Sequence, residues 1–574
     1  MPAGVAPRTF TRAILDKTAT VQLAPDLSGL PASEREVVRL LNEAGGIVQQ
    51  IHERELHHDA DRARSGLVKI APRLDPAHAQ DLRDLWWLSQ GPIATTLDND
   101  RVPFLPVDSL VPGKNVYPWG VTQKEIDADL AAHPEEREWL LHPRTVVRRA
   151  TPAGYRADLA VLTQNPGLRM LLPDVEAMLR AGSASVPGSG PAFYAVPYSL
   201  AWFTDLSRVS SLLFQAAHAA EATSPDFARY LRHRARDLIA NDYEAGDAAW
   251  VTARFGRLNA QIGSYETYDD ELYGVKAFHS LSVLLEDSVR TAAVRAATRG
   301  LQAFENSLPY EPHKRVREDI SVGIYDVIAD FGQSRGTNTA SILPNEQGNV
   351  ARYGRTILMR RNIILDPAVV ASSRAAFEAA VDPRHLAEFD PDGNFYRTLW
   401  HELGHYLGPD LDERGRSLDL ALEEESGTLE EMKADLVSLY LVPALRASGY
   451  YDERMARAVY ASGINRMLNK SQPRPDQVYG VMQNMQLNWF LEHGALSYHP
   501  EMRRLTIDYA KYPAAVASLL REVLALQRAG DKARALAFIE RWNVWDDRHE
   551  ALAAAMKAAE PSRFRLVRYS ALGN

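Results

Sequence analysis

Two histidines four residues apart stand in the segment TLWHELGHYLGPD, residues 398–410, with a glutamate directly after the first. Residues i and i+4 share one face of an α-helix, so His401 and His405 can direct imidazole nitrogens to one point. Glu402 projects about 100° around the helix, where it can reach a metal-bound water without ligating the metal. The pattern predicts a zinc site with Glu402 as general base. The alternative is a chance occurrence of a short pattern on an ordinary helix.

A second segment offers the third ligand. SGTLEEMKADLVSLYLV, residues 426–442, has apolar residues at helical spacing, and Glu431 and Asp435 lie on the same face. We expect Glu431 to bind the zinc and Asp435 to orient a ligand histidine, His401, from behind. The competing interpretation is a helix-capping box between Thr428 and Glu431, with Glu430 as a solvated neighbour.

The composition limits how zinc could be held. The chain has 574 residues and no cysteine, so disulfides and thiolate zinc sites are excluded. Histidines and carboxylates must then bind the metal, and such sites more often serve catalysis than structure. The formal net charge of -9, spread along the chain, disfavours nucleic acid or an anionic membrane as a partner.

The sequence leads us to expect no membrane-spanning segment and shows no signal-peptide pattern within the residues given. No apolar run approaches the ~18 residues of a transmembrane helix. The N-terminal segment MPAGVAPRTFTRAILDK lacks the apolar core of a signal peptide. We therefore expect a cytoplasmic protein, or a periplasmic one if a leader has been removed.

Most of the chain has helical periodicity, and a smaller part has strand character. Helices are predicted over 277–303, 391–407, 428–446 and 513–541. Strands are predicted over 195–203, 321–331 and 356–365. The pattern indicates an α-rich protein of two lobes with a small β component.

The two zinc-helix motifs resemble those of the dipeptidyl peptidase III family of metallopeptidases. EEMKAD, residues 430–435, is similar to the family's second zinc helix, with Glu431 as its ligand. The family motif HExxGH has six residues, whereas this chain has the five-residue HELGH. Further similarity lies in SYETYDDELYG (264–274), SILPNEQ (341–347) and the helices of 484–542, so that the resemblance covers about 264–570.

This resemblance implies an α-rich α+β fold of two lobes around a wide cleft. One lobe is helical and binds zinc, and the other is mixed, with a small β-barrel. We expect residues 1–275 plus 320–365 to form the mixed, substrate-binding lobe. Residues 276–319 plus 366–574 would form the zinc-binding lobe.

The resemblance also implies residues that hold the substrate. Glu266 and Tyr268 match the family's substrate motif, with Tyr268 a catalytic candidate, and Asn345 matches one of its two asparagines. The other falls on an isoleucine, although Asn338 lies nearby. Asn484 is aligned with a histidine of the family's catalytic region, and a neighbouring arginine is also replaced. Asn345 as a turn residue and Asn484 as a helix-surface residue are the alternatives.

By likeness, the chain is expected to be a zinc-dependent exopeptidase with one Zn²⁺ per chain, releasing dipeptides from the N-termini of short peptides. Because the family's histidine and arginine are missing, a related zinc hydrolase acting on a non-peptide amide or ester is the first alternative. A peptide-binding protein that retains the fold is the second. An intact Glu402 argues against a pure binder, which has no need of a base.

Overall fold

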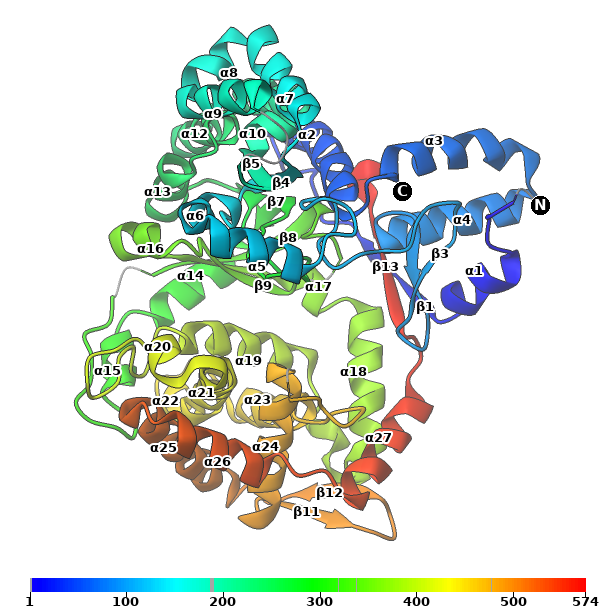
Figure 1. The fold of residues 1–574 in the computed structure, drawn as a ribbon. Helices are drawn as coiled ribbons and strands as arrows, with labels where there is room; N and C mark the ends of the chain where they lie inside the picture. The colour runs from blue at the N-terminus through cyan, green and yellow to red at the C-terminus, as the bar shows by residue number, and fades with distance from the viewer. Residues whose placement is uncertain (1–2, 186–189, 318–319, 337, 476, 574) are drawn as a thin grey trace.

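A computed structural model describes residues 3–185, 190–317, 320–336, 338–475 and 477–573. Its mixed half is built on a five-stranded sheet (Figure 1). The strands are β6 (Leu258–Ser264), β7 (His279–Glu286), β8 (Ser321–Gly332), β9 (Ala340–Leu343) and β10 (Thr356–Arg360). In space they follow the order β6-β7-β8-β10-β9. Only the β8–β10 pair is parallel.

The central strands are buried on both faces, which explains their nearly continuous apolar sequence. Successive side chains of a strand point to opposite faces. In β10, Ile357 and Met359 accordingly belong to the hydrophobic core shared with the helical half, and Leu358 belongs to the core on the other face. The sheet therefore joins the two halves of the molecule.

Helices cover the sheet on the side away from the helical half. The main ones are α2 (Ala32–Leu56), α11 (Phe203–Ala220) and α12 (Pro225–Ala240). Around them lie α5 (Gln123–Ala132), α6 (Arg137–Leu140), β4 (Thr145–Arg149), α7 (Pro152–Gln164), α8 (Pro166–Leu171), α9 (Pro173–Ala184), β5 (Phe193–Pro197), α10 (Tyr198–Ala201), α13 (Glu244–Thr252) and α16 (Gln347–Tyr353).

The first part of the chain forms an extension at the side of the mixed half (Figure 1). It contains α1 (Arg8–Leu15), β1 (Thr18–Leu23), α3 (Ala60–Ile70), α4 (Pro76–Ser89), β2 (Ile93–Thr95) and β3 (Arg101–Pro103). Strand β1 pairs in parallel with β13 (Phe564–Tyr569), so the two ends of the described chain lie side by side.

The second half of the chain is mainly helical and lies below the sheet in Figure 1. Two short connecting helices, α14 (Ser288–Ala297) and α15 (Leu301–Glu305), precede β8, and α17 (Arg361–Ile364) follows β10. The helices beyond are α18 (Pro367–Ala380), α19 (Pro391–Gly404), α20 (Leu418–Leu422), α21 (Ser426–Tyr440), α22 (Val442–Ala447), α23 (Glu453–Arg466), α24 (Val478–Glu492), α25 (Tyr512–Ala529), α26 (Lys532–Trp542) and α27 (Asp547–Ala559), with a hairpin of β11 (Leu496–His499) and β12 (Arg504–Ile507).

The predicted fold class, α-rich α+β with two lobes, is confirmed. The β component is a sheet whose edge strands, β6 and β9, show no pairing with each other in the part of the chain described, so it forms half a barrel. The predicted strands 195–203 and 356–365 are strands only in their first halves, β5 and β10, and continue as the short helices α10 and α17. The predicted helix 513–541 is two helices, separated at Gly530 with a φ of 56°.

The prediction of a helix over 277–303 is wrong at its beginning. Residues His279–Glu286 form β7, which pairs with β6 and β8. Serines alternate with apolar residues from Ser280 to Val283, a period of two that favours a strand. The strand falls inside 276–319, which we grouped with the zinc-binding lobe, yet it is hydrogen-bonded within the sheet of the other lobe. The division into two lobes at these boundaries stays a prediction.

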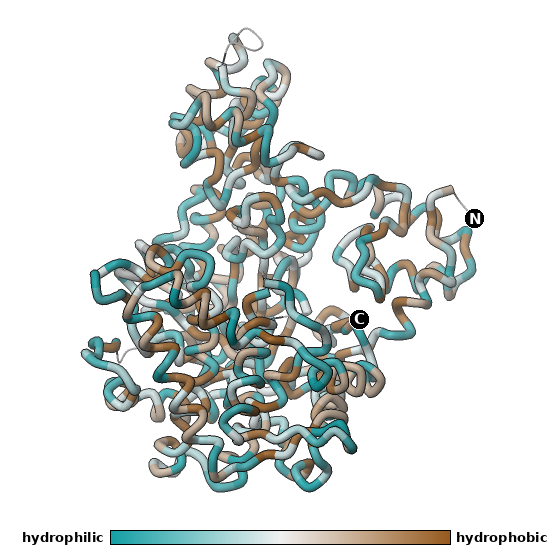
Figure 2. Tube along the Cα trace, turned by 60° about the horizontal axis from the view of Figure 1, so that its bottom comes forward, coloured by the Kyte–Doolittle hydropathy of each residue, from teal (hydrophilic) through white to brown (hydrophobic). Residues whose placement is uncertain are grey.

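Hydrophilic and hydrophobic residues alternate along the helices throughout the chain (Figure 2). Among the described residues, no helix combines the length and the apolar character that crossing a membrane requires.

Candidate metal centre

Helix α19 carries the two histidines of the HELGH motif. Asp390 caps the helix by accepting a hydrogen bond from the backbone N–H of Asp392. The regular helix ends at Gly404, and His405 keeps right-handed helical backbone angles. The rings of His401 and His405 therefore share one side of the helix, with centroids 4.9 Å apart.

Gly404 lets the second helix approach closely. A Cβ atom at this position would lie 2.9 Å from the carbonyl oxygen of Ala434 and 3.0 Å from its Cα, too close for a real side chain. Glycine avoids this clash because it has no Cβ atom. Helix α21 thus packs against α19 almost backbone to backbone, which brings Glu431 beside the histidines.

The three predicted ligands converge. The Nε2 atoms of His401 and His405 lie 3.2 and 3.9 Å from the same oxygen, Oε2 of Glu431. One candidate ligand atom from each of the three residues lies within 4.8 Å of the others. This Glu431 oxygen is buried and makes no hydrogen bond. Two imidazoles and a carboxylate are a donor set that suits zinc, so the residues present fit the ion.

A carboxylate stands behind each histidine. Nδ1 of His401 lies 2.8 Å from Asp435, as expected from the sequence. Nδ1 of His405 lies 2.9 Å from Glu430, a contact that the sequence reading did not assign. Hydrogen bonds at Nδ1 fix the ring orientation and leave Nε2 to face a metal. The spacing of four between Glu431 and Asp435 was the only local sequence signal for a carboxylate that orients a histidine. The contact of Glu430 with His405 joins α21 to the end of α19, and no spacing within one helix predicts it.

Buried cations balance these outer carboxylates. Arg397 donates to Asp435 at 2.7 Å, and Nζ of Lys433 lies 2.7 Å from Glu430. Burial alone would raise the pKa of both carboxyls, but Arg397 and Lys433 outweigh it and hold each pKa well below its usual range. Burial lowers the pKa of His401, but the hydrogen bonds of its ring to Asp435 and Glu431 outweigh burial and raise the pKa to about 9. The surroundings therefore favour positive charge at the ligand atoms.

Glu402 faces the open side of this centre. It lines a cavity of about 600 Å³ together with His401. No hydrogen bond or ion pair joins Glu402 to another residue in the described ranges. Its carboxylate is therefore free to accept a proton, whereas Asp435 and Glu430 are each paired with a cation. Among the described residues, Glu402 and Glu431 have no lysine or arginine partner, and only the two histidines contact Glu431 with ring nitrogens.

Residues of the mixed lobe lie across from Glu402. Asn345 donates to Glu266 at 3.3 Å and to the carbonyl of Tyr265 at 3.4 Å. Burial raises the pKa of the Glu266 carboxyl, and the negative charge of Glu402 adds to the rise, while Asn345 opposes it. The two predicted substrate residues Glu266 and Asn345 are therefore adjacent, and Glu266 is close enough to Glu402 for the two charges to interact.

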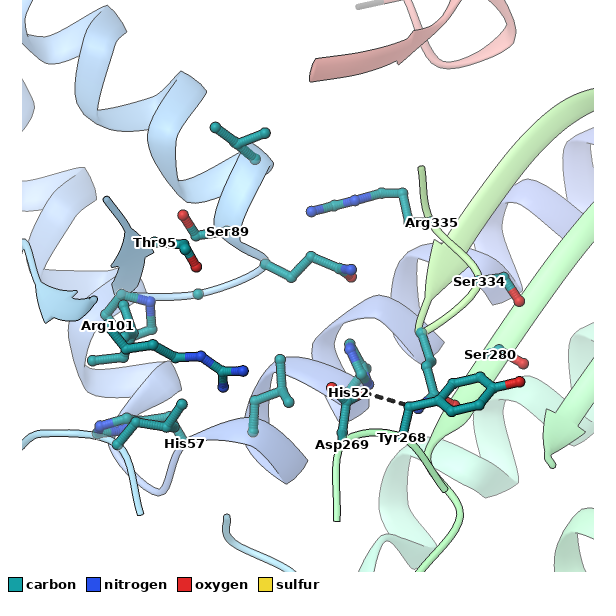
Figure 3. Close-up of a pocket in the computed structure, with 18 of the residues that line it drawn as sticks. His52, His57, Ser89, Thr95, Arg101, Tyr268, Asp269, Ser280, Ser334 and Arg335 are labelled. Carbon is teal, nitrogen blue, oxygen red and sulfur yellow. Dashed lines mark hydrogen bonds between the residues drawn. The ribbon is translucent and has the colours of Figure 1, made fainter. Parts of the chain in front are cut away.

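Glu266 and Tyr268 also line a second cavity of about 340 Å³, between the end of α4 and the turn after β8 (Figure 3). Asn338 lines both this cavity and the one beside Glu402. Tyr268 is 74% exposed. Desolvation of its hydroxyl and the carboxylates of Glu266 and Glu431 raise its pKa. The two cavities therefore meet near the residues predicted to hold the substrate.

The assignment of Asn484 to the substrate site is wrong. Asn484 is 1% exposed, and its amide donates to Asn543 and to the carbonyl of Val544. Asn488 likewise donates to the carbonyl of Val544. Both asparagines face the connection between α26 and α27, away from the cavity. The motif alignment had placed the helix in the wrong register.

Two residues near the start of α24 face the cavity instead. Tyr479 and Gln483 line it, and the Tyr479 hydroxyl donates to Glu431 at 3.0 Å. Helix α24 is buried almost all round from Val481 to Leu487, so no periodicity in its sequence singled out positions 479 and 483.

Among the described residues, one other group has metal-ligand character, formed by His57, His58 and Asp59. Nδ1 of His57 accepts from the backbone N–H of Asp59, and Nε2 lies 3.0 Å from the carbonyl of Asp108. Because both ring nitrogens of His57 are already hydrogen-bonded, this group fits a metal less well than the centre on α19 and α21.

Comparison with known proteins begins with the sequence. The chain matches no family model. It is 27% identical over 450 residues to Nudix hydrolase 3 of Arabidopsis thaliana. The match covers 75% of this chain and 54% of that protein, so the chain spans about half the length of its curated relative.

Solved structures match along nearly the whole chain. A dipeptidyl peptidase III structure from Caldithrix abyssi has a TM-score of 0.81 at 22% identity, covering 97% of this chain and 99% of that one. The dipeptidyl-peptidase III of Corallococcus sp. strain EGB has a TM-score of 0.76 at 23% identity, covering 99% of this chain and 98% of that one. The resemblance found in the sequence motifs is confirmed at the level of the fold: this chain has the dipeptidyl peptidase III fold.

Proposed function

We propose that the protein is a zinc-dependent metallopeptidase that releases dipeptides from the N-termini of short peptides. One observation carries the proposal: Nε2 of His401 and Nε2 of His405 converge on a buried, unpaired oxygen of Glu431, beside a free Glu402 on an open cavity. The fold of the two dipeptidyl peptidase III structures supports it. The Arabidopsis relative does not change it, because only about half of that protein is matched.

His401, His405 and Glu431 would hold the zinc ion. When bound, zinc acts as a Lewis acid and lowers the pKa of water toward neutrality. Glu402 accepts a proton from the water whose oxygen attacks the peptide carbonyl carbon. It then gives this proton to the leaving amine nitrogen as the C–N bond breaks. Its lack of a cationic partner leaves its carboxylate available for both transfers.

Tyr479 is the residue we assign to the developing negative charge on the carbonyl oxygen. Its hydroxyl lines the same cavity as Glu402 and donates its one proton to Glu431 at 3.0 Å, so it would turn from Glu431 to the carbonyl oxygen when substrate binds. Hydrogen-bond donors aimed at a developing oxyanion contribute strongly to catalysis. Tyr268 faces this site from the mixed lobe and is the second candidate donor.

Glu266 and Asn345 would set the position of the cut. The carboxylate and the amide oxygen can accept hydrogen bonds from a peptide's terminal ammonium, and these charge-assisted bonds are the strong ones. Substrates that lack a free ammonium would leave the Glu266 carboxylate without a cationic partner. The bond that is cleaved would therefore be fixed by its distance from the terminal ammonium.

A metal-replete assay with a dipeptidyl-arylamide and its N-acetylated form tests this function. We expect the free form to be cleaved, and acetylation to lower kcat/KM by roughly 10- to 150-fold, which corresponds to a lost charge-assisted hydrogen bond of ~1.5–3 kcal/mol. Glu266→Gln should impair cleavage of the free form by a similar factor and barely affect the acetylated form.

Asp382→Asn serves as a control for the loss of one carboxylate charge, since Asp382 caps a short helix in the helical lobe away from the cavities. Equal cleavage of the free and acetylated forms would defeat the exopeptidase function. A zinc hydrolase that acts inside peptides, or on other amides and esters, would then be favoured. Failure to cleave any amide or ester by the zinc-loaded protein would favour a peptide-binding role.

The carboxylates behind the two histidines give a separate prediction. Asp435→Asn and Glu430→Gln should each weaken zinc affinity by ~10–100-fold without abolishing binding, because neutral side chains orient the rings less firmly and lower their basicity. Competition with a zinc chelator measures the affinity. The melting temperatures of the zinc-free variants show how much stability is lost with the ion pair to Arg397 or Lys433. Any further loss in the presence of zinc is then an effect on metal binding. If both variants bind zinc as tightly as the parent, these carboxylates do not support the metal and serve only as ion-pair partners of Arg397 and Lys433.

A further inference from the structure

The cavity beside Glu402 has a strongly uneven charge. Four cationic side chains line it, whereas Glu402 is its one carboxylate among the described lining residues. The cationic residues are Arg397, Arg466, Lys470 and Arg565. They come from α19, the end of α23, the segment after it, and β13, so elements from distant parts of the chain build this wall.

Two of these cations are already paired. Arg397 is buried against Asp435, and Lys470 is paired with Glu560. Arg466 and Arg565 form no ion pair with any residue in the described ranges. The guanidinium of Arg466 lies over the ring of Tyr479, 5.3 Å from its centroid, and its Nε is buried without a hydrogen bond. The cavity therefore holds unpaired positive charge directly beside the residue assigned to the oxyanion.

The positions of the two cavities indicate which part of a bound peptide would lie beside these cationic residues. Glu266 lines the cavity of about 340 Å³, and Asn338 lines both cavities where they meet. A peptide whose ammonium lies at Glu266 and whose cleaved bond lies at Glu402 must extend its remaining residues past Glu402. The cavity with Arg466 and Arg565 is the space lined by Glu402 itself.

We propose that this cavity binds a carboxylate of the leaving fragment through Arg466 and Arg565. The inference rests on the proposed function and specifies its substrates: short peptides with a negative charge beyond the cleaved bond. That charge is either the C-terminal carboxylate or an acidic side chain. Arginine suits this task because its planar guanidinium can donate two parallel hydrogen bonds to one carboxylate.

A panel of four tetrapeptides of otherwise identical sequence tests the proposal. The third residue, which follows the cut, is Asp or Asn, and the C-terminus is an acid or an amide. We expect the parent enzyme to favour the charged member of one of these pairs by about 10-fold or more in kcat/KM. A preference for acid over amide identifies the terminus as the source of the charge, and a preference for Asp over Asn identifies the side chain.

Arg466→Gln and Arg565→Gln should each reduce that preference, with the larger loss in Arg466→Gln because this residue is less exposed. Arg457→Gln is the matched control, since Arg457 lies on the same helix α23 but packs over Tyr509 and lines neither of the two cavities. It should leave the preference as in the parent. Equal cleavage of all four peptides by the parent overturns the proposal, as does a preference that persists in both Arg466→Gln and Arg565→Gln.

Binding of alanyl-alanine and of its amide, measured by calorimetry on the zinc-loaded protein, keeps the test independent of catalysis. Tighter binding of the acid, reduced in Arg466→Gln, supports the carboxylate site even if no peptide is cleaved. In that case only the proposed peptidase function fails. Equal binding of acid and amide, together with equal cleavage of the Asp and Asn peptides, overturns the carboxylate site alone.

Discussion

Glu402→Gln is expected to lower kcat by at least ~100-fold, the usual scale for a positioned general base, while the protein keeps its zinc. Glutamine has nearly the shape of glutamate but cannot accept the proton from water. Because Glu402 makes no hydrogen bond or ion pair with a described residue, its replacement breaks no recorded contact. Steady-state kinetics with a dipeptidyl-arylamide, together with elemental analysis of the same sample, measure both effects.

The control for this experiment is Glu492→Gln. Glu492 stands at the end of α24, with its side chain 61% exposed and 3.8 Å from Arg541. The same chemical change there should leave kcat and zinc content at the parent level. If zinc-loaded Glu402→Gln turns over substrate at close to the parent rate, Glu402 is not the general base and another residue must accept the proton.

The His401→Ala/His405→Ala double variant is expected to lose stoichiometric zinc and, with it, the peptidase activity. The parent protein should carry about one zinc per chain, since the three convergent residues form a single site. Without two of its three protein ligands, the site retains only the carboxylate of Glu431. Elemental analysis after dialysis against a weak chelator measures the retained metal.

His493→Ala provides the matched control. The ring of His493 stacks on Trp489, and its Nδ1 lies 2.8 Å from the carbonyl oxygen of Trp489. His493 does not line the cavity beside the candidate centre. This variant should keep its zinc. Full zinc retention in the double variant would show that the metal binds elsewhere, and the group of His57, His58 and Asp59 would be the next site to examine.

The pairs of site residues that the sequence predicted from spacing alone are those carried by one helix. His401 and His405, or Glu431 and Asp435, share a face because of helical geometry alone. The two pairs come together because α19 and α21 pack closely, and Gly404 permits this close packing. The substrate pair Glu266 and Asn345 came from the family resemblance, and the structure places them in contact.

The contacts that escaped prediction depend on how separate elements are aligned. Glu430 reaches His405 across two helices, and Tyr479 reaches Glu431 from a third. Nothing local distinguishes Glu430 from a solvated neighbour. Asn484 was placed at the site because a motif alignment without structure could not fix the register of α24. The strand β7 was missed because its period-of-two pattern covers only four residues, Ser280 to Val283, and the helical pattern that follows was extended over it.

The pairing of β1 with β13 bears on the order in which the molecule assembles during synthesis. In the described chain these two strands form a sheet of their own, and they come from opposite ends of it. A ribosome produces β1 early, but its partner becomes available only after both lobes have been made. Contacts between such distant segments are slow to form, because the chain between them must first be ordered. Arg565 lies on β13, so the cationic wall of the cavity is completed last. A nascent chain can therefore build its candidate metal centre before it can build the proposed carboxylate site.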